Sequence, residues 1–508
     1  MMFKRLLSVS GFTLLSRVTG FIQGIVQAAI LGSGAASDAF TVALRLPNSF
    51  RGIFGEGSFN VSFVPRYAKA RVTEGDEEAA KFANMIFSWQ MAAQFVILVL
   101  AMLFMPQVVS LMALGFAPAK AALATELSRI TFPYLILTLV AVQMSAMLNA
   151  HERFAAAAGW SILLNVCMIG TLLAWQWFGD AAHAAAWGVL IAGFLQLVLI
   201  WWAGRDAGLH LKLVVPRWTP QVKSFLIALG NGTIGSAGAQ IALFIDTFIA
   251  SFLATGVLTS LAYADRINQL PFGTVGIALA TVLLPEMSRR FAKGDRVGAE
   301  TVQNNAAALA LFLTLPFVAA FFTVPQTIMR GFFAHGAFSL HAADIAASAL
   351  SAYGVGLPAW VLVRVVAATF YARGNTAAPA RAAILAVLVN VGMKFLLVWG
   401  FNLGAVGVAL GTSLGSWANV GLLMFMSRQK GLLRIESHFT RAIPAILLAA
   451  IATGVAALGA TLLIEPHMLG MRFGREVTLA VAIFAGGAAY VLTGFVFRNK
   501  LDLKRLLK

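Results

Sequence analysis

Six basic side chains lie within long apolar stretches of the sequence: Arg17, Arg45, Arg51, Arg266, Arg364 and Lys394. A charge in a membrane-spanning stretch costs at least about 2.5 to 3.5 kcal/mol, so it must face water, a partner or a ligand. The planar fork of donors on arginine suits a phosphate or diphosphate better than a point charge does. We therefore predict that Arg17, Arg51 and Arg266 line a hydrated cavity and bind an anion there.

One predicted helix carries four charged residues, in the stretch SDAFTVALRLPNSFRGIFGEGSF. At about 100° per residue, Asp38, Arg45 and Glu56 lie within about 20° of one stripe on this helix. Arg51 lies off the stripe in a straight helix. Pro47 removes a backbone hydrogen bond, and it can kink the helix between the two arginines. The pattern predicts a helix with one polar face, and it adds Arg45 to the candidate binding residues.

A second stretch, AYADRINQLPFG, repeats the combination of charge and proline. It places Asp265, Arg266 and Pro271 in a later helix. Their positions there correspond roughly to those of Arg45 and Pro47 in the helix that begins near residue 36. Because proline interrupts the helical hydrogen-bond ladder, both prolines are predicted hinge positions.

The acidic residues near these arginines have two possible roles. Asp38, Glu56 and Asp265 could orient the arginines and limit the net charge of the site. Alternatively, internal ion pairs, such as Asp38 with Arg45 and Asp265 with Arg17, could only join helices. We favour binding, because neutral packing would join helices at a lower desolvation cost.

The composition indicates which elements must position these side chains. The chain has 508 residues, of which 60% are hydrophobic and only 11% charged. No soluble core could bury so large an apolar surplus, so we predict an all-α, polytopic integral membrane protein. The net charge of +17 comes from dispersed basic residues, which does not favour nucleic-acid binding. The single cysteine, Cys167, allows no internal disulfide.

Apolar windows predict fourteen transmembrane helices, beginning near residues 6, 36, 82, 123, 155, 183, 221, 258, 303, 344, 379, 403, 440 and 474. With the N-terminus in the cytoplasm, 26 of the 37 lysines and arginines fall on the cytoplasmic side and five on the opposite side. The positive-inside rule therefore places both termini in the cytoplasm, and this pattern fits an inner-membrane protein.

A weak internal repeat suggests how the helices are grouped. FVPRYAKA resembles LLPEMSRRFAK about 220 residues later, and LNVCM resembles VNVGM at a similar offset. The offset spans six predicted helices, so the copies would share one orientation and form parallel repeats around a central cleft. The predicted parts are a six-helix lobe at 1–217, a second six-helix lobe at 218–432, and a final helix pair at 433–508.

Other polar residues in apolar stretches are weaker candidates. Asp246, in LFIDTFIASF, is either a site for a coupling cation or proton or a water-lined structural residue, and Asn390 could join it. Arg364 and Lys394 could line the cleft, but we expect them to reach an interface by snorkelling.

Two further patterns have simpler explanations. GTSLG matches the serine-hydrolase elbow, but it lies in a continuous apolar helix, so we expect Gly411 and Gly415 to provide close helix packing. His335 and His341 share a loop without a third ligand, so no metal site is expected.

Several motifs together resemble the MviN/MurJ family of lipid II flippases over essentially the whole chain. They are SRVTGF, SDAF, RLPNSFRGIFGEGSFNVSFVP, YADRINQLPFGTVGIALATVLLPEMSR and FYARGNTAAP. The resemblance implies the fold of the multidrug/oligosaccharidyl-lipid/polysaccharide exporter superfamily. It also implies alternating access that moves an undecaprenyl-diphosphate-linked disaccharide-pentapeptide from the cytoplasmic to the periplasmic leaflet. The last two helices would border a groove for the lipid tail, among the membrane lipids.

The resemblance also assigns residues. The family's essential cavity arginines match Arg17, Arg51 and Arg266, and its cavity acids match Asp38, Glu56 and Asp265. A sodium site in some relatives resembles the region of Asp246 and Asn390, so coupling to Na⁺ or H⁺ is expected, with no other cofactor. A single chain is expected to be the transport unit. The sequence departs from the family pattern at Gln23, Gly52 and Gln269.

Other functions fit the sequence less well. A drug or polysaccharide-lipid exporter of the same superfamily is the main alternative. A glycosyltransferase or polymerase would need catalytic acids in an extracytoplasmic loop, whereas the longest such loop, at 323–343, has no Asp or Glu. A structural scaffold would need no buried arginines. No nucleotide-binding GxxxxGK[ST] or zinc-binding HExxH motif occurs, so we expect a transporter and not an enzyme.

Overall fold

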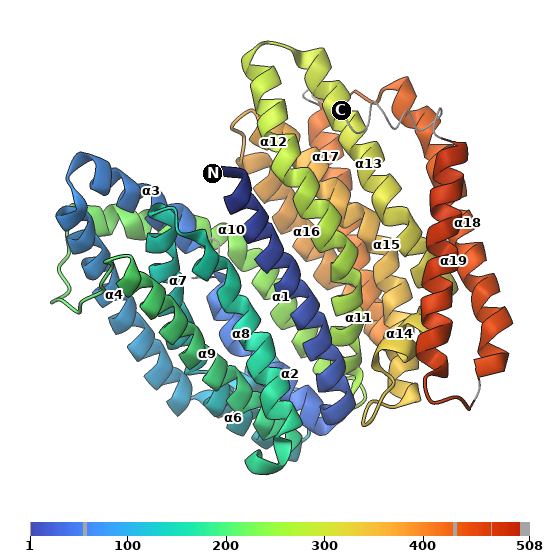
Figure 1. Cartoon of the computed structure of the whole chain (residues 1–508), viewed down its shortest axis with the longest axis horizontal. Helices are drawn as coiled ribbons and strands as arrows, with labels where there is room; N and C mark the ends of the chain where they lie inside the picture. The colour runs from blue at the N-terminus through green and yellow to red at the C-terminus, as the bar shows by residue number, and fades with distance from the viewer. Residues whose placement is uncertain (1, 54–57, 430–433, 469, 498–508) are drawn as a thin grey trace. The chain divides into compact units, whose positions relative to one another are not determined.

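A computed structural model describes residues 2–53, 58–429, 434–468 and 470–497, and its described residues form helices and no strand. Within these ranges the chain divides into two compact units, Met1–Gly256 and Val257–Lys508. The helices of the first unit are α1 (Met2–Leu31), α2 (Ala35–Arg51), α3 (Ser58–Thr73), α4 (Asp76–Leu103), α5 (Met105–Met112), α6 (Pro118–Thr131), α7 (Tyr134–Ala150), α8 (Phe154–Leu173), α9 (Ala181–Asp206) and α10 (Pro220–Ser251). Figure 1 shows them in blue to green.

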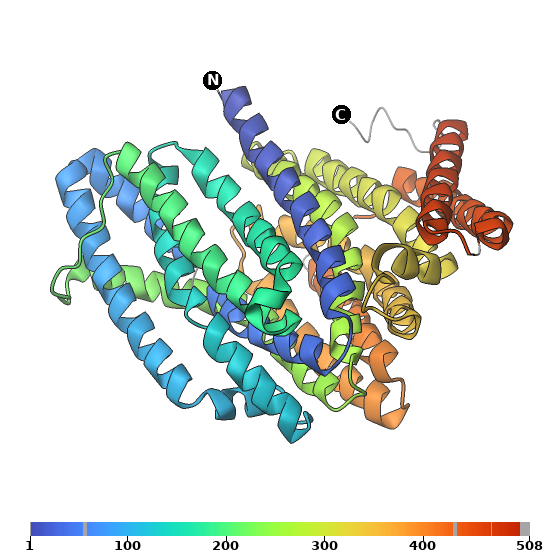
Figure 2. The ribbon, with the colours of Figure 1, turned by 60° about the horizontal axis from the view of Figure 1, so that its bottom comes forward.

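The second unit is also helical. Its helices are α11 (Val257–Pro271), α12 (Ile277–Ala292), α13 (Arg296–Thr323), α14 (Pro325–Phe333), α15 (Leu340–Tyr371), α16 (Ala377–Phe395), α17 (Gly404–Gln429), α18 (Ser437–Met468) and α19 (Gly474–Val496). The final pair, α18 and α19, lie side by side and pack against α13 and α14 of the same unit. Figure 2 shows this pair in red at the edge of the second unit.

Eleven segments among the described residues are long and apolar enough to cross a membrane. The chain is therefore an all-α, multi-pass membrane protein, as predicted. The segments occur in α1, α4, α6–α7, α8, α9, α13, α15, α16, α17, α18 and α19. The three other predicted spans, near 36, 221 and 258, coincide in position with α2, α10 and α11, and as membrane spans they stay predictions.

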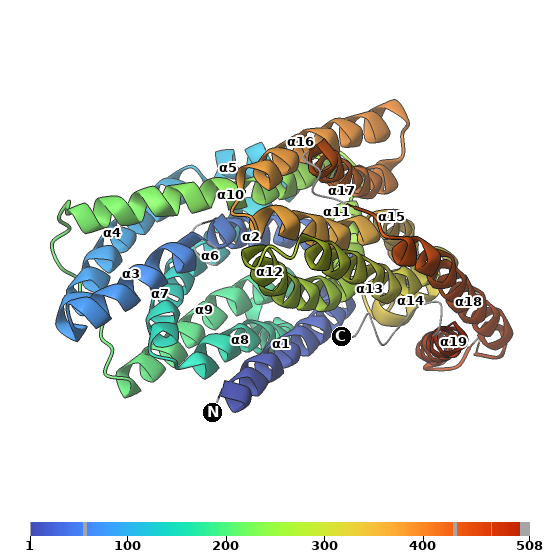
Figure 3. The ribbon, with the colours of Figure 1, turned by 90° about the horizontal axis from the view of Figure 1, so that it is seen from above.

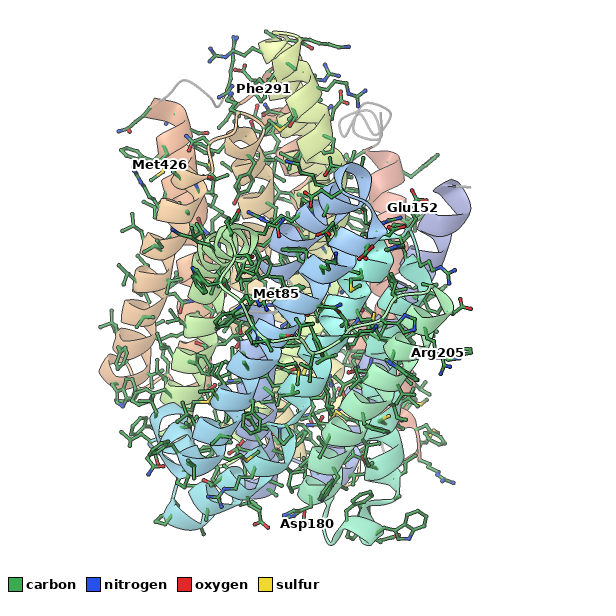
Figure 4. All side chains as sticks on the ribbon, turned by 90° about the vertical axis from the view of Figure 1, so that its left-hand side faces the viewer. Met85, Glu152, Asp180, Arg205, Phe291 and Met426 are labelled. Atoms are coloured by element: carbon green, nitrogen blue, oxygen red, sulfur yellow. The ribbon has the colours of Figure 1, made fainter. Side chains whose placement is uncertain are left out.

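The boundary between the two compact units, at 256/257, lies later in the sequence than the predicted lobe boundary at 217/218. Helix α10 packs against α3, α4 and α5, which keeps it in the first unit. The segment before α10 is extended and is held along α4 by side chains of that helix. The backbone N–H of Lys212 donates to Asn84 Oδ1 at 2.8 Å, and the N–H of Val214 donates to Ser88 Oγ at 2.8 Å. Figure 4 labels Met85 on this part of α4.

Of the two prolines expected to act as hinges, one lies inside a helix and the other at a helix end. Pro47 lies inside α2, four residues before its end at Arg51. Pro271 is the last residue of α11, and a π-helical turn, Phe272–Gly276, follows before α12. Because proline has no backbone N–H, it removes one helical hydrogen bond, and a widened turn accommodates the change.

Helices α16 and α17 pack closely through two glycines, as predicted from GTSLG. A Cβ at Gly411 would lie 2.4 Å from Lys394 Cγ, and one at Gly415 would lie 2.5 Å from Asn390 Cβ and 3.0 Å from its Cα. Between the glycines, the buried Ser413 hydroxyl donates to the carbonyl oxygen of Ala352 on α15 at 2.7 Å. The motif is therefore a packing motif, and its serine is a structural hydrogen-bond donor.

Gly415→Ala is expected to destabilise the protein by about 1–3 kcal/mol, because the new methyl group overlaps the backbone side of Asn390. Gly421→Ala on the same helix is the matched control, since nothing lies within 4 Å of the added Cβ. This control should be stabilising by roughly 0.5–1 kcal/mol through helix propensity. Thermal unfolding of the two purified variants would measure both effects, and equal unfolding temperatures would contradict the packing assignment.

Candidate functional site

Arg17 lies on α1 beside the contact that this helix makes with α8, which Figure 3 shows from above. Polar groups hold the two helices together: the hydroxyls of Ser16 and Ser161 lie 2.9 Å apart, and Asn165 Nδ2 donates to Ser16 O and Thr19 Oγ1 at 3.0 and 3.1 Å. Arg17 follows Ser16 by about 100° around the helix, so it lies at the edge of this contact. It is half-buried and makes no hydrogen bond or ion pair with any described residue of its unit.

The two arginines of α2 have hydroxyl partners in the first unit. Arg45 Nη1 donates to Thr247 Oγ1 of α10 at 2.6 Å. Arg51 Nη1 donates to the Tyr134 hydroxyl at the start of α7 at 3.2 Å. Both arginines are half-buried. A hydroxyl can orient a guanidinium without neutralising its charge, so the Thr247 contact fixes the direction of Arg45 and leaves its charge able to attract an anion.

Asp38 is held by a partner that the sequence analysis missed. Its side chain is 1% exposed, and its Oδ2 accepts from Lys120 Nζ at 2.6 Å and from the Gly256 N–H at 2.8 Å. Lys120 lies in the first turn of α6, 82 residues away. The alternative in which Asp38 pairs with Arg45 is wrong, because the contact of Arg45 is with Thr247. The available signal was that Lys120 is one of only five basic residues assigned to the extracytoplasmic side.

The sequence departs from the family pattern at Gly52, just after α2, and at Gln23 on α1. Glu56 lies outside the described residues. Gly52 lies against α10, where an added Cβ would be 2.7 Å from Gln240 Nε2. A basic side chain at position 52 would have to displace Gln240, so the departure at Gly52 is coupled to the side chain opposite it. Gln23 is buried on α1, and its Nε2 donates to Gln27 Oε1 at 2.6 Å.

In the second unit, Asp265 and Arg266 lie half-buried on α11. Gln269 is the third position at which the sequence departs from the family pattern. Its side-chain Nε2 donates a hydrogen bond to Asp265 Oδ2, one turn earlier. An acid at this position would repel Asp265, whereas the amide supplies a donor. Tyr263, one turn before Ile267, packs its ring against Phe333 and Phe338 at centroid distances of 4.9 and 5.3 Å, which anchors this part of α11.

Asn268 is a second residue that the sequence analysis missed. It lies two positions after Arg266, and its side chain is fully buried. Neither its amide nitrogen nor its oxygen has a hydrogen-bond partner among the described residues. Burying an amide without hydrogen-bond partners costs free energy. Asn268 therefore joins Asp265 and Arg266 as a third costly polar residue on α11. The signal was available, since an asparagine in an apolar helix is as conspicuous as Asn390.

The candidates for ion coupling lie on different units. Asp246 is half-buried on α10 of the first unit. Asn390 is 9% exposed on α16 of the second, where it packs against Gly415. Within the described residues, no group of three or more His, Cys, Asp or Glu side chains is placed to hold a metal ion.

The expectation that Lys394 snorkels to an interface is wrong. Its side chain is fully buried on α16. The close approach of Gly411 covers its stem, so α17 closes the route to an interface. Arg364 on α15 is exposed, and its guanidinium carbon lies 4.8 Å from the centroid of the Phe272 ring. A cation–π contact of this kind holds the arginine beside the π-helical turn that follows Pro271.

Sequence comparison shows which proteins share these features. A family model described as "Lipid II flippase MurJ" matches residues 27–477. A "Probable lipid II flippase MurJ" from Rhizobium meliloti (strain 1021) is 40% identical over 449 residues, which cover 87% of this chain and 82% of the relative. One from Rhizobium tropici is 35% identical over 517 residues, covering 98% of this chain and 96% of the relative. The chain belongs to the MurJ family.

Solved structures agree with this membership at the level of the fold. A structure titled "Lipid II flippase MurJ, inward closed conformation" has a TM-score of 0.80 at 24% identity, covering 97% of this chain and 99% of that one. An inward-facing multidrug resistance transporter of the MATE family has a TM-score of 0.67 at 17% identity, covering 82% and 95%. This MurJ family member therefore shares its overall fold with MATE transporters of the MOP superfamily.

Proposed function

We propose that this chain flips the lipid-linked peptidoglycan precursor, lipid II, from the cytoplasmic to the periplasmic leaflet of the bacterial inner membrane. The observation that carries the proposal is its membership in the MurJ family, with a family match across residues 27–477. The substrate is amphiphilic: a long isoprenoid tail prefers lipid, whereas the diphosphate, sugars and peptide require a polar route. A multi-pass protein with charged residues inside its helices provides the components of such a route.

The arginines are proposed to bind the diphosphate of the substrate. Arg17 supports this role most directly, because it makes no hydrogen bond or ion pair within the described part of its own unit. Arg45 is oriented by the neutral hydroxyl of Thr247, and Arg51 donates to the hydroxyl of Tyr134. Arg266 would contribute from the second unit. In this scheme Asp265, Asp38 and Glu56 limit the net charge or position neighbouring groups.

We further propose that transport proceeds by alternating access. The fold is shared with MATE family transporters whose structures are titled inward-facing, at a TM-score of 0.67, and outward-facing, at a TM-score of 0.59. Pro47 and Pro271 weaken α2 and α11 locally, so they are proposed hinges for the change. Coupling to Na⁺ or H⁺ through Asp246 or Asn390 is part of the proposal, as is a tail groove bordered by α18 and α19.

Depletion and complementation would test the proposed function. The chain would be expressed in bacteria depleted of their own lipid II flippase, and the leaflet that holds the precursor would be assayed. We expect restored growth and a precursor accessible on the periplasmic side. A membrane-inserted chain that leaves the precursor in the cytoplasmic leaflet would overturn the proposal. Restored export of a drug or polysaccharide lipid instead would favour the alternative exporter, for which the MATE likeness is the supporting observation.

A further inference from the structure

A polar cavity of about 740 Å³ lies in the second unit where α18 ends and α19 begins. Its walls come from the end of α13, from α14, from the start of α15 and from the adjoining ends of α18 and α19. The volume is in the range of pockets that bind small ligands. The cavity contains none of the residues assigned above to diphosphate binding or ion coupling.

Close packing of α14 against α19 shapes one side of this cavity. A Cβ at Gly331 would lie 2.7 Å from Leu479 Cδ2 and 3.3 Å from the Arg475 carbonyl oxygen, so only glycine allows this approach. Arg475 Nη1 then donates to the Ala334 carbonyl oxygen at 2.9 Å, which fixes the arginine at the cavity wall. Figure 1 shows α14 beside the lower ends of α18 and α19.

Some charged residues of the cavity are already neutralised. Arg330 donates to both carboxylate oxygens of Asp344, at 2.8 and 3.0 Å. His335 lies 3.7 Å from Glu476 and hydrogen-bonds the Gly331 carbonyl oxygen at 3.1 Å. Arg330 and Asp344 therefore largely neutralise each other, and His335 is held between Glu476 and a backbone carbonyl oxygen.

Two opposite charges in the cavity do not neutralise each other. Glu465, on the last turn of α18, makes no hydrogen bond or ion pair with a described residue. Among the described residues, the contact of Arg472 is with the ring of Phe473, whose centroid lies 5.4 Å from the guanidinium carbon. With the remaining donors of Arg475, the cavity therefore offers a cationic region and a separate carboxylate. Such an arrangement complements a ligand that carries both an anion and a cation.

The position of the cavity indicates that the ligand comes from the bilayer. Helices α18 and α19 are both long and apolar enough to span a membrane, so the turn that joins them lies at a membrane surface. Leu462 of α18 lines the cavity and is 63% exposed, so the polar hollow continues onto an apolar face. A lipid with its headgroup in the hollow could place its acyl chains along this face.

We propose that this cavity binds the headgroup of a zwitterionic phospholipid with a primary ammonium group. Arg472 and Arg475 contact the phosphate, and Glu465 accepts hydrogen bonds from the ammonium. The leucines of α18 contact the beginning of the acyl chains. The site is independent of the proposed flipping function, since a bound phospholipid here would stabilise the α14–α18–α19 corner whatever the transported substrate is.

Native mass spectrometry and thermal unfolding of the full-length purified protein would test the site. The protein would be titrated with phosphatidylethanolamine, phosphatidylglycerol or inorganic phosphate. We expect phosphatidylethanolamine to be retained most strongly and to raise the unfolding temperature. Arg472→Gln and Glu465→Gln should each weaken its retention about tenfold, the ratio expected for one charge-assisted hydrogen bond. Arg129→Gln removes an exposed arginine of α6 and should leave retention unchanged.

Each other outcome would overturn the proposal. Equal retention of phosphatidylglycerol with no effect of Glu465→Gln would reveal a simple anion site. Equal stabilisation by inorganic phosphate would show that no lipid is required. Unchanged phosphatidylethanolamine retention in both pocket variants would place the lipid elsewhere. Within the described part of the chain, the two substituted residues make one ring contact and no hydrogen bond or ion pair, so the variants are expected to fold. Thermal unfolding of the lipid-free proteins checks this.

Discussion

Replacing Arg17 by alanine is expected to lower lipid II flipping by about 10–100-fold, the ratio that corresponds to losing a hydrogen bond to a charged group. The substitution should have little effect on stability, because Arg17 makes no hydrogen bond or ion pair within the described part of its unit. Its removal therefore leaves no group there without a partner. The amount of inserted protein and its unfolding temperature should stay near the wild-type values. The leaflet assay in complemented cells would measure the loss.

Two further variants make this result interpretable. Arg266→Ala should have the same effect on flipping if Arg17 and Arg266 bind the same diphosphate. Arg205→Ala is the matched control, because Arg205 lies exposed at the end of α9, where its contact among the described residues is with the Trp201 ring, and Figure 4 shows it on the outer side. Full complementation by both Arg17→Ala and Arg266→Ala would defeat the assignment, whereas a loss in the control as well would indicate a general effect of removing arginine.

Breaking the buried pair of Asp38 and Lys120 is expected to destabilise the protein by about 3–5 kcal/mol. Both side chains are largely excluded from water, with exposures of 1% and 8%, so removing either one leaves the other buried without the opposite charge of this pair. Lys120→Met keeps most of the side-chain volume, and Asp38→Asn keeps an acceptor for the Gly256 N–H. Thermal or denaturant unfolding of the single and double variants would measure the coupling.

The double variant distinguishes the coupling energy of the ion pair from the effect of each substitution on its surroundings. Removing both charges should recover a large part of the loss, because replacing a buried ion pair by neutral groups costs much less than breaking it. An exposed pair provides the comparison: Arg71 lies 2.9 Å from Asp76, whose side chain is 80% exposed, so its coupling should be only about 0–1 kcal/mol. Strictly additive effects of Asp38→Asn and Lys120→Met would show that the buried contact contributes no coupling.

Residue types and helical periodicity predicted much of the candidate site. A bilayer requires long apolar helices and makes each internal charge costly, so the positions of Arg17, Arg45 and Arg266 were conspicuous in the sequence alone. The glycine pair at Gly411 and Gly415 was equally predictable, because small residues four apart mark one helix face. The membrane class, the helical fold and the family therefore followed from local patterns.

Only the tertiary structure decided which partner each polar group meets. Periodicity gives the direction of a side chain on its own helix, but it does not say which distant helix covers that face. Asp38 thus pairs with Lys120, 82 residues away, and not with Arg45 on its own helix. Lys394 is buried because α17 closes over it at Gly411, and the cavity around Glu465 and Arg472 forms only where α14 packs on α19. These contacts depend on helix packing, which is set by the whole set of neighbouring surfaces and not by any one stretch of sequence.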